Sequence, residues 1–230
     1  MKKFIAFTLA ETLIVMGIIG IVSALTLPNL NSSTGEKEKI AKVKKIYQNL
    51  TDAYGRAVAV YGPYEDWNAN STRLGERLSD FLKISKNCET NNTGCFNSEK
   101  PKEFGGTELP LFEGYQFILA DGTSVAISDY IYVDIDGPNK GQTTIGKDIF
   151  IFEIYDNELI PLHNNVVSGT SCGYSCVDGP DASPLGHKDY FSDCAAHWVI
   201  NFDNMDYLKI DDDNKCPNGT TLSLSKITCK

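Results

Sequence analysis

The first thirty residues hold the longest apolar run in the chain, and that run limits what the protein can become. From residue 7 to residue 27 the sequence reads FTLAETLIVMGIIGIVSALTL, 21 residues in which Glu11 carries the only charge. An α-helix rises about 1.5 Å per residue, so this run would be about 31 Å long, enough to cross a hydrocarbon core of about 30 Å. Lys2 and Lys3 precede it, which predicts a cytoplasmic N-terminus. We therefore expect one transmembrane helix over 7–28.

Three interpretations of this run compete. Val22-Ser23-Ala24 resembles the cleavage site of a secretory signal peptide, but the run is long for a signal and contains Glu11. A plain membrane anchor would bury the Glu11 carboxylate at a cost of about 2.5 kcal/mol or more at the bilayer centre. In the third interpretation, cleavage between Ala6 and Phe7 gives Phe7 a free amine, about one helical turn from Glu11. That amine can pair with Glu11 of a neighbouring subunit and so favour assembly, because either charge buried alone is penalised.

The start of the chain resembles the N-terminus of type IV prepilins and of type II secretion pseudopilins. The matching features are a short basic leader at residues 1–6, an apolar helix, and the residues Ala6, Phe7, Thr8, Leu9, Glu11 and Pro28. The resemblance implies that a membrane prepilin peptidase cuts before Phe7 and methylates the new amine. Ala6 stands where the family usually has glycine, and Thr12 stands where leucine is common.

The resemblance also implies a function and a set of partners. The chain would be a structural subunit of a type IV pilus or of a type II secretion pseudopilus, assembled through its N-terminal helix. Its partners would be other pilin or pseudopilin subunits, the prepilin peptidase, an inner-membrane assembly platform and membrane lipid. The precursor would cross the bacterial inner membrane once, with its C-terminal domain extracytoplasmic, and would join a filament after assembly.

Two other function classes are compatible with such a helix. The chain could be a membrane-anchored extracytoplasmic binding module, in which calcium takes part, or an anchored hydrolase. The sequence has no Walker loop, no GxGxxG, no HExxH and no nucleophile elbow, so we expect no enzyme. Lys and Arg total 21 against 30 Asp and Glu, a net charge of −9, so we expect no nucleic-acid partner because phosphate binding rests on basic residues.

The pattern after the membrane segment is helical again over 31–62. Residues 31–35 (NSSTG) have the composition of a turn and helix cap, Pro28 is expected to end or kink the first helix, and Gly62-Pro63 is expected to end the second. The apolar positions alternate in spacing between three and four, as on one face of an amphipathic helix; they are Ile40, Val43, Tyr47, Leu50, Tyr54, Ala57 and Tyr61. The lysines between 37 and 45 fit a solvated helix face better than a basic binding patch.

The remaining sequence predicts an α+β fold in which the long N-terminal helix packs on an antiparallel sheet of about four strands, as in pilins. Residues 63–106 form the helix–sheet loop, with Trp67 as an anchor and a short helix over 72–82. Residues 107–163 form the sheet; its expected strands are 115–119, 124–133, 148–155 and 158–162. Asp121-Gly122 and Asp156-Asn157 are the expected tight turns.

Residues 164–230 are expected to form a loop-rich, disulfide-containing region with one or two short strands, of which 194–200 is the most core-like part. The seven cysteines are Cys88, Cys95, Cys172, Cys176, Cys194, Cys216 and Cys229. Export to an oxidising space favours disulfides; the candidate pairs are Cys88–Cys95, Cys216–Cys229, and Cys172–Cys176 or one of these two with Cys194. A zinc site of Cys172, Cys176, Cys194 and His197 is the weaker alternative. An odd count leaves at least one cysteine unpaired or intermolecular.

The loop after residue 133 holds the one candidate metal site. Asp134 and Asp136 alternate with Ile135, so their carboxylates point the same way, and Asn139 and Asp148 can join them. Calcium prefers six to eight such oxygen ligands, but the spacing does not fit an EF-hand. A turn rich in Gly, Asp and Asn that satisfies its own side chains is the competing interpretation.

Overall fold

The computed structural model describes residues 9–67, 70–91, 93–103, 106–162, 188–211, 215–222 and 226–229, with the backbone alone for 23–34 and 188–193. The chain divides into two compact units, Met1–Lys39 and Ile40–Lys230, and the boundary falls within the first helix. The second unit combines helices with an antiparallel sheet, so the α+β prediction is confirmed.

Helix α1, Leu9–Tyr61, is a single helix of 53 residues. The helix continues through Pro28 and through 31–35, so the expected helix end and the expected turn with a cap are wrong, while the kink at Pro28 stays a prediction. A proline inside a helix removes one backbone hydrogen bond, but the strongly helical sequence on either side lets the helix propagate across it. The helix ends as expected at Gly62, which has a φ of 82° and donates its N–H to the Val58 carbonyl at 2.9 Å.

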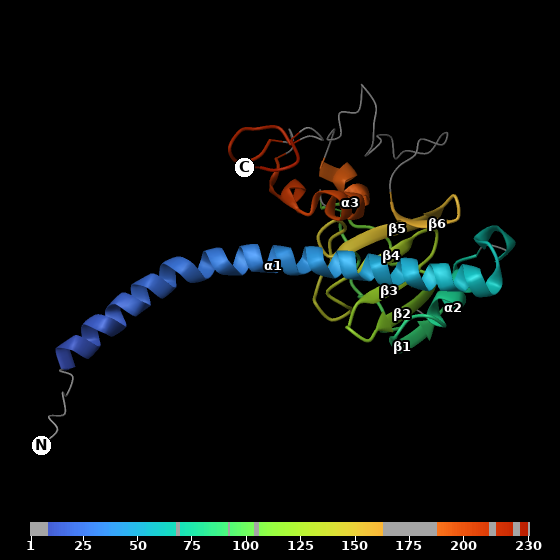
Figure 1. The fold of residues 1–230 in the computed structure, drawn as a ribbon, viewed down its shortest axis with the longest axis horizontal. Helices are drawn as coiled ribbons and strands as arrows, with labels where there is room; N and C mark the ends of the chain where they lie inside the picture. The colour runs from blue at the N-terminus through green and yellow to red at the C-terminus, as the bar shows by residue number, and fades with distance from the viewer. Residues whose placement is uncertain are drawn as a thin grey trace, which may run out of the picture. The chain divides into compact units, whose positions relative to one another are not determined.

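The sheet has six strands among the described residues, where we predicted about four. They are β1 (Ile84–Glu89), β2 (Tyr115–Leu119), β3 (Ser124–Ile127), β4 (Ile131–Asp134), β5 (Ile149–Tyr155) and β6 (Glu158–Pro161). Each strand pairs antiparallel with the next, so the spatial order follows the chain order, as Figure 1 shows. The tight turn between β5 and β6 is confirmed: Asp156 and Asn157 both have positive φ, at 49° and 60°.

The two additional strands have different origins. The expected strand 124–133 is in fact β3 and β4, which are joined by residues 128–130 and pair with Ile127 opposite Ile131. Strand β1 lies in the segment predicted as loop, because its sequence ISKNCE is polar and mostly exposed and lacks an apolar alternation. It is an edge strand held by backbone pairing to β2, with two irregularities in register.

The main core lies between the second part of α1 and one face of the sheet. The buried α1 side chains are Ile40, Val43, Ile46, Leu50, Ala53, Tyr54 and Ala57, which confirms most of the predicted stripe. They pack in one cluster with sheet residues that include Phe117, Val133 and Phe152. Tyr47 is partly buried and stacks on Phe152 with ring centroids 5.7 Å apart.

Ion pairs add to this packing at the edges of the core. Lys44 lies 2.8 Å from Asp203, and Lys45 lies 3.1 Å from Asp121, in the turn between β2 and β3. Two of the lysines on the solvated face therefore contact other elements of the same domain. Such exposed pairs each contribute little free energy, so the apolar packing, rather than these pairs, holds the helix on the sheet.

Four smaller helices lie in the described part of the domain. The 3-10 helix η1 (Tyr64–Trp67) buries Trp67, whose indole N–H donates to the Gly62 carbonyl at 2.8 Å, so the predicted anchor is confirmed. Helix α2 (Ser71–Ser79) matches the expected short helix and packs so closely on β2 that a Cβ at Gly75 would lie 2.3 Å from the Tyr115 ring. Helix α3 (Lys188–Phe202) packs on β5 and β6.

Helix α3 corrects the prediction of a loop-rich region with short strands. Its residues Ala195, Ala196 and Val199 are fully buried in the main core, so the piece predicted as most core-like is indeed core, but as helix. The core-like run CAAHWVI (194–200) has only seven residues, too few for the sequence to distinguish a helix from a strand. The 3-10 helix η2 (Asp206–Lys209) follows it.

Candidate functional site

The first part of α1 exposes its apolar side chains on every side. Between residues 9 and 22 the large apolar side chains are 53–81% exposed; they are Leu9, Leu13, Ile14, Val15, Met16, Ile18, Ile19, Ile21 and Val22. At 100° per residue, these positions surround the helix rather than forming one stripe. A helix that is apolar all round needs a covering environment on every side, which is a membrane or other protein.

No helix among the described residues is both long enough and apolar enough to cross a membrane. The predicted span begins at Phe7, which lies outside the described residues.

Glu11 lies in the first turn of α1, on the exposed apolar surface. A carboxylate in the first turn is favoured by the positive end of the helix dipole. The predicted processing residues, Ala6 and Phe7, lie outside the described residues, so the pairing between the Phe7 amine and Glu11 stays a prediction. The structure brings the carboxylate and the apolar surface together on one helix, which is the part of the predicted assembly site within the described chain.

The predicted calcium loop is organised around Asp134, which is fully buried at the end of β4. Its Oδ1 accepts the backbone N–H groups of Asp136 at 3.0 Å and Gly137 at 3.1 Å, while its Oδ2 is buried and has no hydrogen-bond partner among the described residues. Asp148 accepts the N–H of Thr144 at 3.2 Å through its own Oδ2. Asp134 and Asp148 therefore each use one carboxylate oxygen to accept backbone N–H groups of the loop, as the turn interpretation predicts.

Electrostatics at this loop disfavour charge on Asp134. Burial raises the pKa of the Asp134 carboxyl to about 7; its two backbone hydrogen bonds oppose the rise, and the Asp136 and Asp148 carboxylates add to it. Asn139 is exposed. Among the residues that the structure describes, no group of three or more His, Cys, Asp or Glu side chains is placed to hold a metal ion. Calcium binding at Asp134, Asp136, Asn139 and Asp148 is thus a prediction without support from this geometry.

Two of the predicted disulfides are present. Cys88–Cys95 closes a loop after β1 with Cα atoms 6.1 Å apart, and Cys216–Cys229 closes the C-terminal segment with Cα atoms 5.3 Å apart. Cys194 is also disulfide-bonded. A bonded sulfur cannot serve as a zinc thiolate, which disfavours the zinc alternative.

Cys172 and Cys176, the other two cysteines of the zinc alternative, lie outside the described residues. His197 lies on α3, beside a hollow lined also by Tyr47 and Ile160. The geometry of the described residues therefore assigns no ligand role to this histidine.

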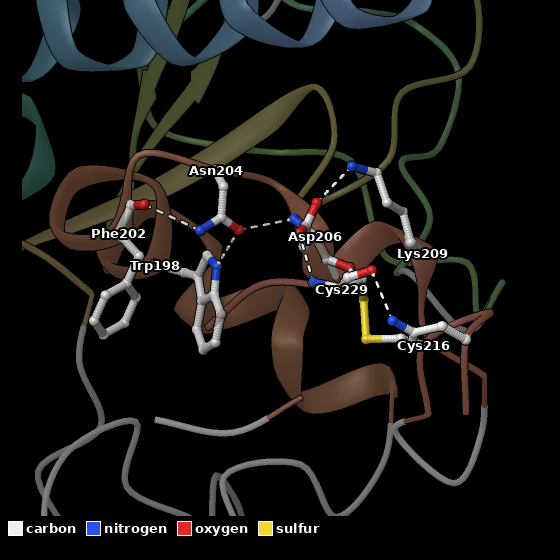
Figure 2. A network of polar contacts seen from close by, with 8 residues as sticks. Trp198, Phe202, Asn204, Asp206, Lys209, Cys216 and Cys229 are labelled. Atoms are coloured by element: carbon white, nitrogen blue, oxygen red, sulfur yellow. Dashed lines mark hydrogen bonds and ion pairs between the residues drawn. A yellow bond between two sulfur atoms is a disulfide. The ribbon is translucent and has the colours of Figure 1, made fainter. Parts of the chain in front are cut away.

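The C-terminal disulfide is tied to α3 through a partly buried polar network that the sequence did not reveal (Figure 2). The Asp206 Oδ2 accepts the backbone N–H of Cys229 at 2.8 Å, and its Oδ1 accepts the Lys209 ammonium. Asn204 accepts both the Trp198 indole N–H and the Asp206 N–H at 3.0 Å. Asp206 is an ordinary acidic residue in sequence, and only the return of the chain at Cys229 gives it this role.

Comparisons with protein-family models, with curated proteins and with solved structures give no match for this chain.

Proposed function

We propose that this chain is a pilin-like structural subunit, cut before Phe7 and assembled through its N-terminal helix into a type IV pilus or a type II secretion pseudopilus. The observation that carries the proposal is the exposed apolar surface around α1 between Leu9 and Val22. A stable protein does not leave such a surface in water, because apolar area is driven out of contact with it. A membrane before assembly and neighbouring subunits after assembly would each cover all sides of the helix.

Glu11 supports the choice of assembly over simple anchoring. Its carboxylate lies within the surface that must be covered, where burying a charge is costly. Cleavage before Phe7 would create an amine four residues away, and the amine of a neighbouring subunit would offset that penalty. A tether that only fixes location has no use for this carboxylate.

The disulfides support an extracytoplasmic location for the C-terminal domain. Cys88–Cys95 and Cys216–Cys229 would form and persist in an oxidising compartment. The N-terminal part of the chain would then cross the inner membrane over 7–28, and the peptidase, the assembly platform and lipid would be its partners there.

The first experiment substitutes Glu11 with glutamine and measures co-assembly with tagged wild-type subunits by crosslinking. We expect Glu11→Gln to enter the membrane and fold normally but to co-assemble at least tenfold less. The neutral amide leaves the neighbour's amine buried without a counter-charge, a cost of about 3 kcal/mol or more. Glu38→Gln, the same change at an exposed site on the same helix, is the matched control and should assemble normally. Equal co-assembly of the two variants would contradict the assembly role.

The second experiment is a mass measurement of the mature chain isolated from a host with a prepilin peptidase. We expect a chain that begins at Phe7 and carries a methyl group on its amine. A chain that begins at Leu25, or one that keeps Met1, would contradict the proposal.

A second candidate function is a membrane-anchored binding module, and one hollow of the domain favours it. The hollow has a volume of about 380 Å³, within the range of small-ligand sites. It is lined by Lys45, Asn49, Arg56, Leu82, Leu119 and Asp121, among others. Normal membrane insertion together with an unchanged crosslink pattern in Glu11→Gln would favour this candidate over the first.

A further inference from the structure

Five asparagines in this chain are followed two residues later by Ser or Thr, with no proline between. They are Asn31, Asn49, Asn70, Asn91 and Asn218. This triplet is the acceptor sequence for N-linked glycosylation, and it is used only where the asparagine is accessible on a surface loop of an exported protein. The structure separates the five by that criterion.

Two of the five lie inside a helix. Asn31 and Asn49 are both in α1, where the residue two positions later points about 200° away around the axis. The Thr51 hydroxyl therefore cannot meet the Asn49 side chain, as the acceptor geometry needs, and the helical backbone at Asn31 is not a surface loop.

Two others have side chains already used by the fold. The Asn70 Oδ1 caps α2 by accepting the Arg73 N–H at 2.7 Å. The Asn218 carboxamide nitrogen donates to the Cys229 carbonyl at 3.2 Å, across the C-terminal disulfide loop. In Asn218 the nitrogen that would accept a sugar is the atom that is engaged.

Asn91 differs from all four. It lies in the loop closed by Cys88–Cys95, beside edge strand β1, and both Asn91 and Thr93 are exposed. The Thr93 hydroxyl donates to Asn91 Oδ1 at 3.0 Å, while Asn91 Nδ2 makes no hydrogen bond within the described part of the chain. The disulfide and a backbone hydrogen bond hold the loop in this conformation; the Asn91 N–H donates to the Cys88 carbonyl at 2.9 Å.

Asn218 is the informative comparison, because its threonine makes the same contact. The Thr220 hydroxyl donates to Asn218 Oδ1 at 2.6 Å, so the two triplets share their hydroxyl geometry. They differ in the nitrogen, which is engaged in Asn218 and open to solvent in Asn91.

We propose that Asn91 is an acceptor for an N-linked oligosaccharide, transferred by an oligosaccharyltransferase from a lipid diphosphate-linked donor. A bond forms between Asn91 Nδ2 and the anomeric carbon of the first sugar, and the bond from that carbon to the phosphate oxygen breaks. The lipid diphosphate leaves, and a base of the transferase takes the proton from the amide nitrogen. The inference rests on the proposed function, because the transfer needs an extracytoplasmic domain.

The test expresses the full chain with an N-oligosaccharyltransferase and a lipid-linked oligosaccharide of known mass, and maps the modified peptide by mass spectrometry. An added acceptor triplet at the C-terminus reports export and transferase activity on the same molecule. We expect the glycan mass on the peptide that contains Asn91. It should fall at least tenfold in Asn91→Gln and in Thr93→Ala, which removes the hydroxyl, and persist in Thr93→Ser and in Asn218→Gln.

The outcomes separate this inference from the proposed function. A modified C-terminal reporter with an unmodified Asn91, or with the glycan on Asn218, overturns the inference and leaves the proposed function standing. A chain in which neither the reporter nor Asn91 is modified, in cells whose transferase modifies a separate exported acceptor protein, has not been exported, which overturns both. Modification in Thr93→Ala at the wild-type level would also overturn the inference, because the hydroxyl would then have no part in acceptance.

Discussion

Helix α1 has large apolar side chains in both its first and its second part, but the two parts differ in how these side chains are covered. Leu13 and Met16 are 65% and 70% exposed, whereas Val43 and Leu50 are fully buried. The first end has apolar residues all round, and the second has one stripe with polar residues elsewhere. A single stripe can be covered by the chain's own sheet, whereas an apolar cylinder needs an environment on every side. The arrangement of apolar residues around a helix, rather than their number, therefore decides whether the chain's own domain can cover them.

The largest expected effect comes from truncating one residue at each end of α1. Leu50→Ala should lower the free energy of unfolding of the domain by about 2–5 kcal/mol, because it leaves a cavity in the core. Ile18→Ala, which changes an exposed side chain, should leave that free energy unchanged within about 0.5 kcal/mol. Urea unfolding of the full chain in detergent micelles measures both. Equal losses would show that the first end belongs to the folded domain.

The next prediction concerns a buried polar group of the sheet domain, the Asp134 carboxyl, and its effect on stability. The pKa of Asp134 is about 7 in the folded chain, against about 3.9 for an unfolded aspartate. The folded state therefore binds the proton more tightly than the unfolded state does. The resulting contribution of Asp134 to the free energy of unfolding is fully present below pH 4 and is lost as the pH rises to about 7. Three pH units correspond to at most about 4 kcal/mol. Asp134→Asn keeps the Oδ1 acceptor, so its stability relative to wild type should rise with pH over this window.

The measurement compares the two chains by urea unfolding at pH 4, 5.5 and 8, so that other titrating groups cancel in the difference. A difference that does not change with pH would contradict the raised pKa of Asp134. Calcium added at pH 8 extends the test, because a ligand of the folded state alone stabilises it. A calcium-dependent gain in wild type that is absent in Asp134→Asn would establish the predicted calcium site.

The smallest effect compares two glycines on helices with different surroundings. Gly75→Ala should destabilise the domain by about 1–3 kcal/mol, because its Cβ would lie 2.3 Å from the Tyr115 ring. Gly55→Ala on α1 meets nothing within 4 Å and should stabilise by up to about 1 kcal/mol through helix propensity. Thermal unfolding of the two variants gives the sign of each effect. A gain in Gly75→Ala would show that α2 packs more loosely on β2.

Much of the fold could be predicted because its signals are local. The stripe from Ile40 to Ala57, the apolar strands β2 and β5, and the short loop of Cys88–Cys95 are each specified by neighbouring residues. Strand β1 could not be predicted, because a polar edge strand is held by backbone bonds to its neighbour and leaves little pattern in its sequence. Helix α3 was missed for a related reason: its buried alanines contribute only once they meet β5 and β6.

The candidate site likewise has one part that could be predicted from the sequence and one part that could not. Glu11 and the apolar residues around it are read directly from the sequence, because one charge in a long apolar run is unusual wherever the chain folds. The role of the loop acids could not be predicted in this way. Their types indicated a metal site, whereas Asp134 uses one oxygen to hold its own turn, and its other oxygen is buried with no partner in the described part of the chain. Residue types do not show how many of their lone pairs the backbone already occupies.

The sequence alone predicts an apolar N-terminal helix, an amphipathic continuation and an antiparallel sheet, and the structure confirms the amphipathic stripe and the antiparallel sheet, because helix and strand periods are set by consecutive residues. Only the tertiary structure decided that the helix continues through Pro28, that Asp206 holds Cys229, and that the Asn91 nitrogen is open while that of Asn218 is engaged. These outcomes depend on groups far apart in the chain, or on competition between local penalties and the packing around them. Such contacts exist only once the chain has folded.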